Sequence, residues 1–491
     1  MLKIYNTLTG RKEEFKPLTP GQVKMYVCGV TVYDECHLGH ARSALVFETI
    51  RRYLAHSGLA VTFVKNFTDV DDKIINRANE LKIPWQAVTA RYIDAYYRDM
   101  SRLGIQPATV EPKATEHMTE IIELVKTLLS KGVAYQVNGD VYFQVGRYDS
   151  YGRLSKRKLD DMQAGARVEV DERKRNPMDF ALWKSTKPGE PAWASPWGKG
   201  RPGWHIECSA MSMKHLGETF DIHGGGADLI FPHHENEIAQ SCSATGKEFA
   251  RYWLHNGFVQ INQEKMSKSL GNFFTIREIF EKWGYREAVT GEALKYFLLS
   301  SHYRSPLNFS DQALLEAKRT LDDFYSLFLI LGESSGKKSR KISDDDPRRK
   351  TAKELPRAVL EFEKDFHARM DDDFNTPDAM AIFHKLLTLV NIQLDIGFTE
   401  DCIRAREAMQ SVGKVMGLFQ LSVKEWQFQD RAIKLEADQL LADSEIERLI
   451  AERSESKKRR DFARADEIRQ TLAAQGITLE DRPDGTTRWK R

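Results

Sequence analysis

The sequence predicts an α/β protein: a Rossmann-like parallel sheet that an insertion interrupts, then a mostly α-helical bundle and a small C-terminal domain. Two observations lead to this fold class. Near the N-terminus a β-rich run at 23–28 is followed by a helical pattern at 40–56 and a second β-rich run at 61–67, an order typical of a βαβ unit. Beyond Lys268, strand signals become rare and long helical patterns take over.

The first helix is indicated by apolar residues between Val46 and Leu54, which recur at helical spacing, and Gly58 suits its C-terminal end. A helical stretch at 93–129 and a hairpin at 135–145 follow the second strand.

Segment 115–200 is polar at first and then rich in Pro, Gly and Trp, which indicates an insertion into the sheet. The sheet resumes with a strand at 220–223. A turn at the three glycines 224–226 and a helix that begins near Pro232 come next.

The bulk composition limits the class of protein. With 491 residues the chain is too long for one hydrophobic core. The net charge of +2 does not demand a polyanionic partner. Five cysteines in so long a chain do not suggest a secreted disulfide framework. The N-terminus has no signal pattern, and we expect no apolar run to span a bilayer. We therefore expect a cytoplasmic protein that does not bind a membrane.

The run HLGH at 37–40 falls beyond the carboxyl end of the first predicted strand, where open parallel sheets bind ligands. His37 and His40 share one face at the start of a helix, and Gly39 lets a nucleoside approach the backbone. Imidazoles there can hydrogen-bond an α-phosphate and stabilise charge that grows in a transition state. Two unrelated surface histidines remain the alternative for so short a motif.

A second run, KMSKS at 265–269, offers the ammonium groups of Lys265 and Lys268 on a Ser-containing loop. Such a loop can close over a leaving pyrophosphate, although most Lys-rich runs are simply solvated. In this order the two runs resemble the HIGH and KMSKS motifs of class I aminoacyl-tRNA synthetases, with one leucine in place of isoleucine. The resemblance implies an ATP site at Gly39, His37, His40 and Lys268, and catalytic roles for both histidines and both lysines.

Four potential metal ligands lie between the two motifs or beside the first. His233 and Glu237 are one helical turn apart, and Cys28 and Cys208 lie beside predicted strands whose ends can converge. Thiolates with an imidazole favour zinc over magnesium or calcium. Because cysteine is often simply buried and the chain has no Cys-x-x-Cys pair, the spacing alone leaves both interpretations open.

Longer runs make the resemblance more specific. They are NFTDVDDKII at 66–75, GWHIECSAM at 203–211, DIHGGGADL at 221–229, FPHHENE at 231–237 and DDDFNTP at 371–377. Over residues 1 to about 420 the chain resembles the cysteinyl-tRNA synthetases. The resemblance implies one zinc ion held by Cys28, Cys208, His233 and Glu237, and an enzyme whose partners are ATP with Mg2+, L-cysteine and tRNA(Cys).

The implied reaction activates cysteine to cysteinyl-adenylate and transfers it to the 3′ end of the tRNA. In this family the substrate thiol binds the zinc, which explains how serine is rejected: a coordinated thiol loses its proton and a serine hydroxyl does not. A hydrophobic pocket gains only about 1–3 kcal/mol from so small a difference. Four protein ligands are more typical of a closed structural zinc site, so we expect Glu237 to be displaceable or the zinc to become five-coordinate.

The same resemblance divides the chain into functional regions. The nucleotide-binding catalytic domain comprises 1–114 and 201–262, separated by a connective insertion at 115–200. A KMSKS loop with a stem-contact region at 263–305, a helical bundle at 306–420 and an anticodon-binding region at 421–491 follow. We expect a monomer.

Further substrate contacts are expected at Gly29, Thr31, Thr68, Trp204, His223 and Asp228. Asp228 is a candidate for the substrate ammonium, with a turn-capping role as the alternative. Trp204 is a candidate wall of the amino-acid pocket, with a plain core position as the alternative.

Two other functions share some of these features. A ligase that joins cysteine to a sugar amine would have the adenylation site but no C-terminal anticodon-binding region, and the long C-terminal segment here argues against it. A zinc-containing RNA-binding protein without catalysis would not need His37, His40, Lys265 and Lys268. In the C-terminal segment, the basic run 457–460 and Trp489 are candidates for RNA contacts, and an ordinary exposed helix face is the alternative for the basic run.

Overall fold

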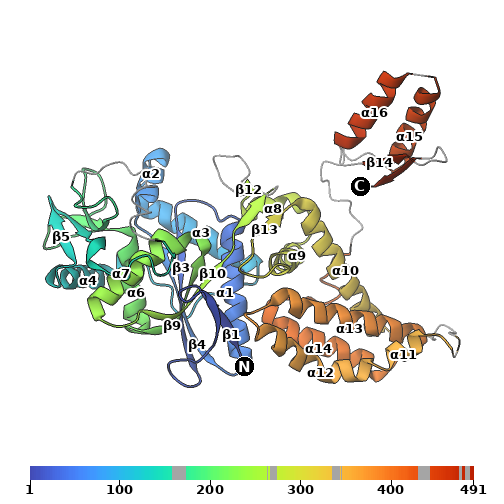
Figure 1. Ribbon diagram of the computed structural model, residues 1–491, viewed down its shortest axis with the longest axis horizontal. Coiled ribbons are helices and arrows are strands. Elements are labelled where there is room, and N and C mark those ends of the chain that lie inside the picture. Colours follow the sequence, from blue (N-terminus) through green and yellow to red (C-terminus); the bar gives the residue numbers. More distant parts are fainter. Residues whose placement is uncertain are drawn as a thin grey trace. The chain divides into compact units, whose positions relative to one another are not determined.

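The computed structural model describes residues 1–157, 173–261, 264–265, 274–333, 343, 345–428, 443–459, 461–474, 478–481 and 487–490. The chain divides into two units, Met1–Phe428 and Gln429–Arg491, and each is described by itself (Figure 1).

A four-stranded sheet forms the frame of the first unit, in the order β10-β9-β3-β4 with every pairing parallel. Its strands are β3 (Gln22–Thr31), β4 (Ala60–Thr68), β9 (Phe220–Gly226) and β10 (Ala250–Asn256). Helix α1 (Leu38–His56) connects β3 with β4, so the predicted βαβ unit is confirmed. A short hairpin, β1 (Lys3–Asn6) and β2 (Arg11–Glu14), precedes it.

The predicted turn at 224–226 is wrong, because the three glycines continue strand β9. Gly224 pairs with Val27 of β3 and with Leu254 of β10. A Cβ atom on Gly224 would lie 2.2 Å from Cε1 of Phe47 in α1. The glycine therefore allows α1 to pack closely onto the sheet, which a turn prediction from composition could not reveal.

Between β4 and β9 the chain adds helices and a second sheet. The helices are α2 (Asp72–Leu81), α3 (Trp85–Arg102) and α4 (Met118–Ser130), with 3-10 turns η1 (Ala114–His117) and η2 (Val145–Arg147). The antiparallel sheet has the order β5-β6-β7-β8, with β5 (Ala134–Val137), β6 (Asp140–Phe143), β7 (Phe180–Ser185) and β8 (Gly200–Pro202).

Strands β5 and β6 confirm the predicted hairpin, but the continuous helical stretch at 93–129 is wrong. Helix α3 ends at Arg102, just before Gly104 takes a positive φ of 64°, and α4 starts only at Met118. A glycine in the left-handed region is a common helix terminator.

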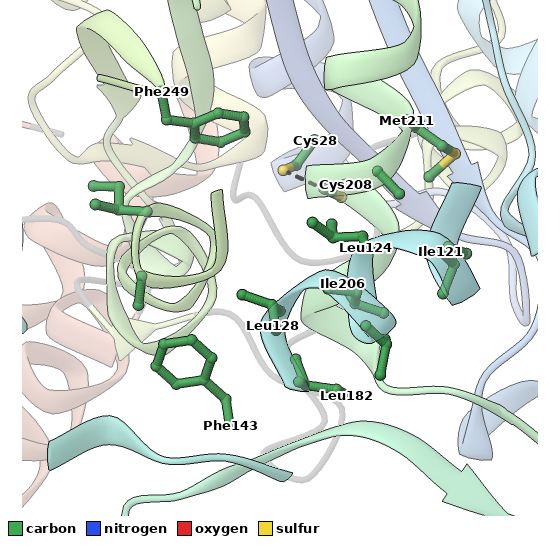
Figure 2. Packing of buried hydrophobic residues seen from close by; sticks show 14 of the residues in the cluster. Cys28, Ile121, Leu124, Leu128, Phe143, Leu182, Ile206, Cys208, Met211 and Phe249 are labelled. Carbon is green, nitrogen blue, oxygen red and sulfur yellow. Dashed lines mark hydrogen bonds between the residues drawn. The ribbon is translucent and has the colours of Figure 1, made fainter. Parts of the chain in front are cut away.

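One hydrophobic core joins this added layer to the sheet. Helix α4 contributes Ile121, Leu124 and Leu128, and α6 (Trp204–Leu216) contributes Ile206 and Met211. Figure 2 shows these side chains gathered between the helices, with Cys28 and Cys208 at the same cluster. The packing of α6 on the sheet thus fixes the position of one cysteine relative to the other.

After the main sheet, β11 (Val259–Ile261) pairs with both β12 (Glu264–Lys265) and β13 (Leu307–Phe309). Helices follow in the order α8 (Ile276–Trp283), α9 (Glu287–Leu299), α10 (Asp311–Glu333), α11 (Arg348–Ala352), α12 (Leu355–Met370), α13 (Thr376–Ile396) and α14 (Glu400–Met416). The mostly helical character predicted for this region is confirmed.

Helix α13 corrects the expectation that no apolar run could span a bilayer. Its 21 residues are long and apolar enough by length and composition. Its buried residues, among them Phe383, Leu386 and Val390, belong to the helical bundle, and Phe383 packs against Phe362 and Phe366 of α12. These contacts are those of a core helix in a bundle.

The second unit contains α15 (Asp443–Lys458), α16 (Phe462–Ala474) and an antiparallel pair, β14 (Thr478–Asp481) with β15 (Thr487–Lys490). Ile446, Leu449, Ile468 and Leu472 form its small core. The described part of the basic run 457–460 lies at the end of α15, as predicted.

Candidate active site and metal centre

A pocket of about 360 Å3 opens at the carboxyl ends of β3 and β9. Its wall includes His37, Gly39 and His40 from the start of α1, and Cys28 from β3. This is the edge at which open parallel sheets bind their ligands. The HLGH motif and the predicted metal ligand Cys28 therefore meet at one pocket.

The two histidines of the motif cap helix α1. Nδ1 of His37 accepts hydrogen bonds from the backbone N–H groups of Gly39 (3.0 Å) and His40 (3.4 Å). In return, Nδ1 of His40 accepts one from the backbone N–H of His37 (3.3 Å). The reciprocal pattern is a capping box, and it stacks the two imidazole rings with centroids 3.7 Å apart.

The capping sets the tautomer of both rings, and their burial sets their charge. A nitrogen that accepts a hydrogen bond carries no proton, so in a neutral ring the proton lies on Nε2. Burial lowers the pKa of His37 to about 4 and the pKa of His40 well below its usual value. Both rings are thus neutral near pH 7, with Nε2–H groups that can donate to a phosphate oxygen without adding a positive charge.

Two lysines that the sequence did not single out also line the pocket. Burial lowers the pKa of Lys65 to about 8, and its Nζ donates to the Tyr96 hydroxyl at 2.6 Å. Nζ of Lys73 lies 5.4 Å from the centroid of the Tyr33 ring, which is also in the pocket wall. Lys73 belongs to the run 66–75 but had no assigned role, Lys65 directly precedes that run, and only the fold of β4 and α2 brings the two lysines beside the histidines.

The four predicted metal ligands come together. Donor atoms of Cys28, Cys208, His233 and Glu237 all lie within 4.8 Å of one another, and all four residues are buried. The two sulfur atoms are 3.7 Å apart, and Oε1 of Glu237 lies 3.4 Å from the Cys28 sulfur. Figure 2 shows the two sulfur atoms pointing toward each other from β3 and α6.

His233 reaches this cluster from an irregular turn rather than from a regular helix. The turn, η4 (Ile230–His234), follows the 3-10 turn η3 (Ala227–Leu229) and runs directly into α7 (Glu235–Thr245), which carries Glu237. The two side chains still meet, with Nε2 of His233 3.1 Å from Oε1 of Glu237. The expected one-turn spacing is therefore confirmed, although the helix begins later than Pro232.

Neighbouring histidines hold these ligands in place. Nε2 of His223 lies 2.9 Å from Oε2 of Glu237, so Oε1 is the oxygen on the side of Cys28. Nδ1 of His205 lies 2.9 Å from Nδ1 of His233, which leaves Nε2 of His233 facing the cluster. Partners of this kind orient metal ligands and set their tautomers.

A second, overlapping donor set exists that the sequence did not reveal. His234 and His223 join Cys28 and Glu237 within the same 4.8 Å limit, and Nε2 of His234 lies 3.3 Å from the Cys28 sulfur. Sequence patterns offer no reason to include His234, because Cys28 lies 206 positions away and only the fold brings the two side chains together. Nδ1 of His234 is 2.8 Å from Nε2 of His255, which ties this ring to strand β10.

The charges in the cluster suit a cation. Burial alone would raise the pKa of Glu237, but His223 and His233 outweigh it and lower that pKa to about 2. A hydrogen bond from Cys28 is the largest influence on Cys208, whose pKa falls to about 6. Burial raises the pKa of the Cys28 thiol. A carboxylate and one thiolate at neutral pH are thus stable in a fully buried site.

Four of the six predicted substrate contacts line the pocket: Gly29, Thr31, Trp204 and Asp228. The Trp204 ring stacks on His233 with centroids 4.2 Å apart and is 38% exposed, so it is a pocket wall rather than a core residue. Gly29 also has a packing role, because a Cβ atom there would lie 1.6 Å from the carbonyl oxygen of Asn66.

Thr68 and His223 do not line this pocket as the structure describes it. Both are buried: the Thr68 hydroxyl accepts from the Asn66 amide at 3.4 Å, and Nε2 of His223 lies 2.9 Å from Oε2 of Glu237. Of the two motif lysines, Lys265 is described only by its backbone in β12, and Lys268 lies outside the described residues.

The remaining cysteines lie outside the cluster. Cys402 is buried in α14, as expected of a core residue, and Cys242 of α7 packs against the hydrophobic core. Cys36 is buried, and burial raises its pKa to about 12.

The chain matches two family models. The one described as tRNA synthetases class I (C) catalytic domain matches residues 14–319, and the one described as DALR domain matches residues 365–420. Among solved structures, methionyl-tRNA synthetase of Mycobacterium tuberculosis in complex with methionyl-adenylate has a TM-score of 0.59 at 17% identity, and the match covers 80% of this chain and 93% of that one. That likeness concerns the fold alone.

Curated relatives match over the whole length. A protein of Geobacter metallireducens named cysteine–tRNA ligase is 55% identical over 495 residues, which cover 100% of this chain and 99% of the relative. A protein of the same name from Geobacter sulfurreducens is also 55% identical, over 492 residues with the same coverage. By its catalytic-domain match and by its identity to these relatives, the chain belongs to the cysteine–tRNA ligase family of class I tRNA synthetases.

Proposed function

We propose that this protein activates L-cysteine with ATP and transfers the cysteinyl group to tRNA(Cys). One observation carries the proposal: Cys28 belongs both to the four-donor cluster and to the wall of the pocket that holds His37 and His40. A ligand in this pocket would therefore reach the metal ligands at one end and the phosphate-binding helix start at the other.

In the proposed ATP site, the backbone at Gly39 and the neutral rings of His37 and His40 receive the nucleotide. Their Nε2–H groups donate to the α-phosphate and stabilise the charge that develops when the carboxylate of cysteine attacks it. Lys265 and Lys268 neutralise the leaving pyrophosphate, which carries Mg2+. The pyrophosphate departs as the adenylate forms.

The buried donor set is suited to zinc, because thiolates are soft ligands, imidazole is a borderline ligand, and zinc also accepts a carboxylate oxygen. Cys28, Cys208, His233 and Glu237 would hold the ion, which when bound supplies a soft Lewis acid for the substrate thiol. His223 keeps Glu237 turned toward the site, and His205 keeps the tautomer of His233. A serine hydroxyl would gain little from the same contact.

Trp204 and Asp228 complete the amino-acid site. Trp204 forms a wall next to His233, and Asp228 offers a carboxylate in the pocket for the substrate ammonium. Gly29 and Thr31 shape the floor at the end of β3. We further infer that region 263–305 and the helical bundle at 306–420 run along the tRNA, that the segment 421–491 reaches the anticodon, and that the protein acts as a cytoplasmic monomer.

Three measurements on the purified full chain test the proposal. Metal analysis should find one zinc per chain, cysteine should stimulate ATP–pyrophosphate exchange, and tRNA(Cys) should become charged. Exchange without charging would favour the ligase that acts on a sugar amine. Neither activity, in protein that contains zinc, would favour an RNA-binding protein without catalysis.

A further inference from the structure

Apart from the buried donor set, the described residues hold one further group of metal-ligating side chains. His56 is the last residue of α1, and Glu363 and His367 are one turn apart on α12. One donor atom from each lies within 4.8 Å of the other two. Nε2 of His56 is 3.2 Å from Oε1 of Glu363, and the two imidazole rings stack with 11° between their planes.

Hydrogen bonds fix the orientation and the tautomer of His367. The Tyr53 hydroxyl donates its single proton to Oδ1 of Asp371 at 2.7 Å. Its oxygen lies 3.2 Å from Nδ1 of His367 and can then only accept, so Nδ1 carries the proton. The lone pair of His367 is therefore on Nε2. A carboxylate that orients an imidazole through its second nitrogen is a recurrent feature of metal sites, and here a tyrosine transmits the effect.

The electrostatics and the access at this position also suit a cation. The carbonyl end of a helix carries partial negative charge, and His56 is in the last turn of α1. The side chains of His56 and Glu363 are 27% and 63% exposed. An ion can thus enter from solvent, and water can fill the coordination positions that the three side chains leave open.

We propose that His56, Glu363 and His367 bind a second divalent transition-metal ion of the zinc type, which imidazole with carboxylate prefers over calcium or magnesium. Coordinated by residues of both helices, the ion would link the C-terminal end of α1 to α12 of the helical bundle. Because the start of α1 carries His37 and His40, the proposed ion fixes the bundle to the same helix that receives the nucleotide. With three protein ligands at the surface, this site fills after the buried one.

The test uses untagged full chain, since a polyhistidine tag would itself bind the probe. The buried site is first loaded with one equivalent of Zn2+, and Co2+ is then titrated while calorimetry and the visible spectrum are recorded. We expect one further equivalent to bind, with a spectrum that lacks a thiolate-to-cobalt charge-transfer band. Such a band would mean that cysteine binds the second ion, and it would overturn the proposal.

Variants locate the second ion. Glu363→Gln and His56→Gln should each weaken its binding by at least about tenfold, and Tyr53→Phe should weaken it through the orientation of His367. Glu361→Gln on the same helix, where the carboxylate pairs with Arg357, is the matched control and should bind like the wild type. No second equivalent would show that His56 and Glu363 form an ion pair only. A second equivalent of equal affinity in every variant would assign the ion to another surface site.

Discussion

The Sγ atoms of Cys28 and Cys208 lie 3.7 Å apart although 180 positions of sequence separate the two residues. One sulfur comes from the central strand β3 and the other from α6, which packs on the sheet through the core shared with α4. The donor cluster is thus a consequence of how α6, which follows the insertion in sequence, packs onto the sheet. Loss of either sulfur should affect the metal and the amino-acid site together.

Cys208→Ser should lower the affinity for zinc by more than about 100-fold and should weaken cysteine binding in parallel. The reason is that a serine hydroxyl stays protonated and is a poor ligand for zinc. Metal content after dialysis and cysteine affinity by calorimetry would measure both effects. Cys242→Ser, which alters a cysteine outside the cluster, is the control. Unchanged affinity for both ligands in Cys208→Ser would remove this residue from the site.

His223→Gln should weaken zinc binding by roughly 10–100-fold without changing its stoichiometry. His223 contacts Oε2 of Glu237 rather than the other donors of the predicted set, so its loss frees the carboxylate to turn. The rate at which a chelator removes zinc would report the change. If His223 is itself a ligand, as the overlapping donor set with His234 allows, the variant would instead lose zinc altogether.

The sequence predicted the members of the donor cluster better than their surroundings. Cys28, Cys208, His233 and Glu237 came from chemistry, spacing and a family resemblance. His234 and His205 did not, because neither has a predicted ligand four residues on, and only tertiary packing brings His234 beside Cys28 and His205 beside His233. The same holds for Lys65 and Lys73, whose positions depend on β4 and α2.

Local sequence patterns also predicted which helices and strands form better than the residues at which they begin and end. The βαβ unit followed from periodicity that the buried faces of β3, α1 and β4 enforce. The glycines at 224–226 look like a turn, because composition cannot reveal that Phe47 needs the space above Gly224. A break inside 93–129 was missed since apolar spacing continues on both sides of Gly104.

His37→Asn should separate the structural role of His37 from its chemical role. Asparagine is a good N-cap, so it can replace Nδ1 of His37 as acceptor for the first backbone N–H groups of α1. It cannot supply the Nε2–H donor. We expect unfolding free energy within about 1 kcal/mol of the wild type and ATP–pyrophosphate exchange slower by about 100- to 1,000-fold.

His37→Ala is the comparison for this prediction, because it removes the cap as well as the donor and should lose stability in addition to activity. Urea unfolding and initial exchange rates would be measured on both variants. Full exchange activity in His37→Asn would mean that the histidine serves only to start the helix.

Asp99→Asn should stabilise the protein at neutral pH and have no effect in acid. Asp99 of α3 is buried, its Oδ2 has no hydrogen-bond partner, and burial together with Glu35 raises its pKa to about 6. An unfolded aspartate has a pKa of about 3.9. Between these values the native state keeps a proton that the unfolded state releases, so wild-type stability falls as pH rises from about 4 to about 6.

Asparagine is neutral throughout, so the variant should be more stable by about 1–2 kcal/mol above about pH 6, and the difference should vanish below about pH 4. Urea unfolding over this pH range would measure it. Asp94→Asn, an exposed position on the same helix, should reproduce the wild-type profile. A constant gain for Asp99→Asn at every pH would show that packing or hydrogen bonding of the amide, rather than ionisation of the buried carboxyl group, explains the change.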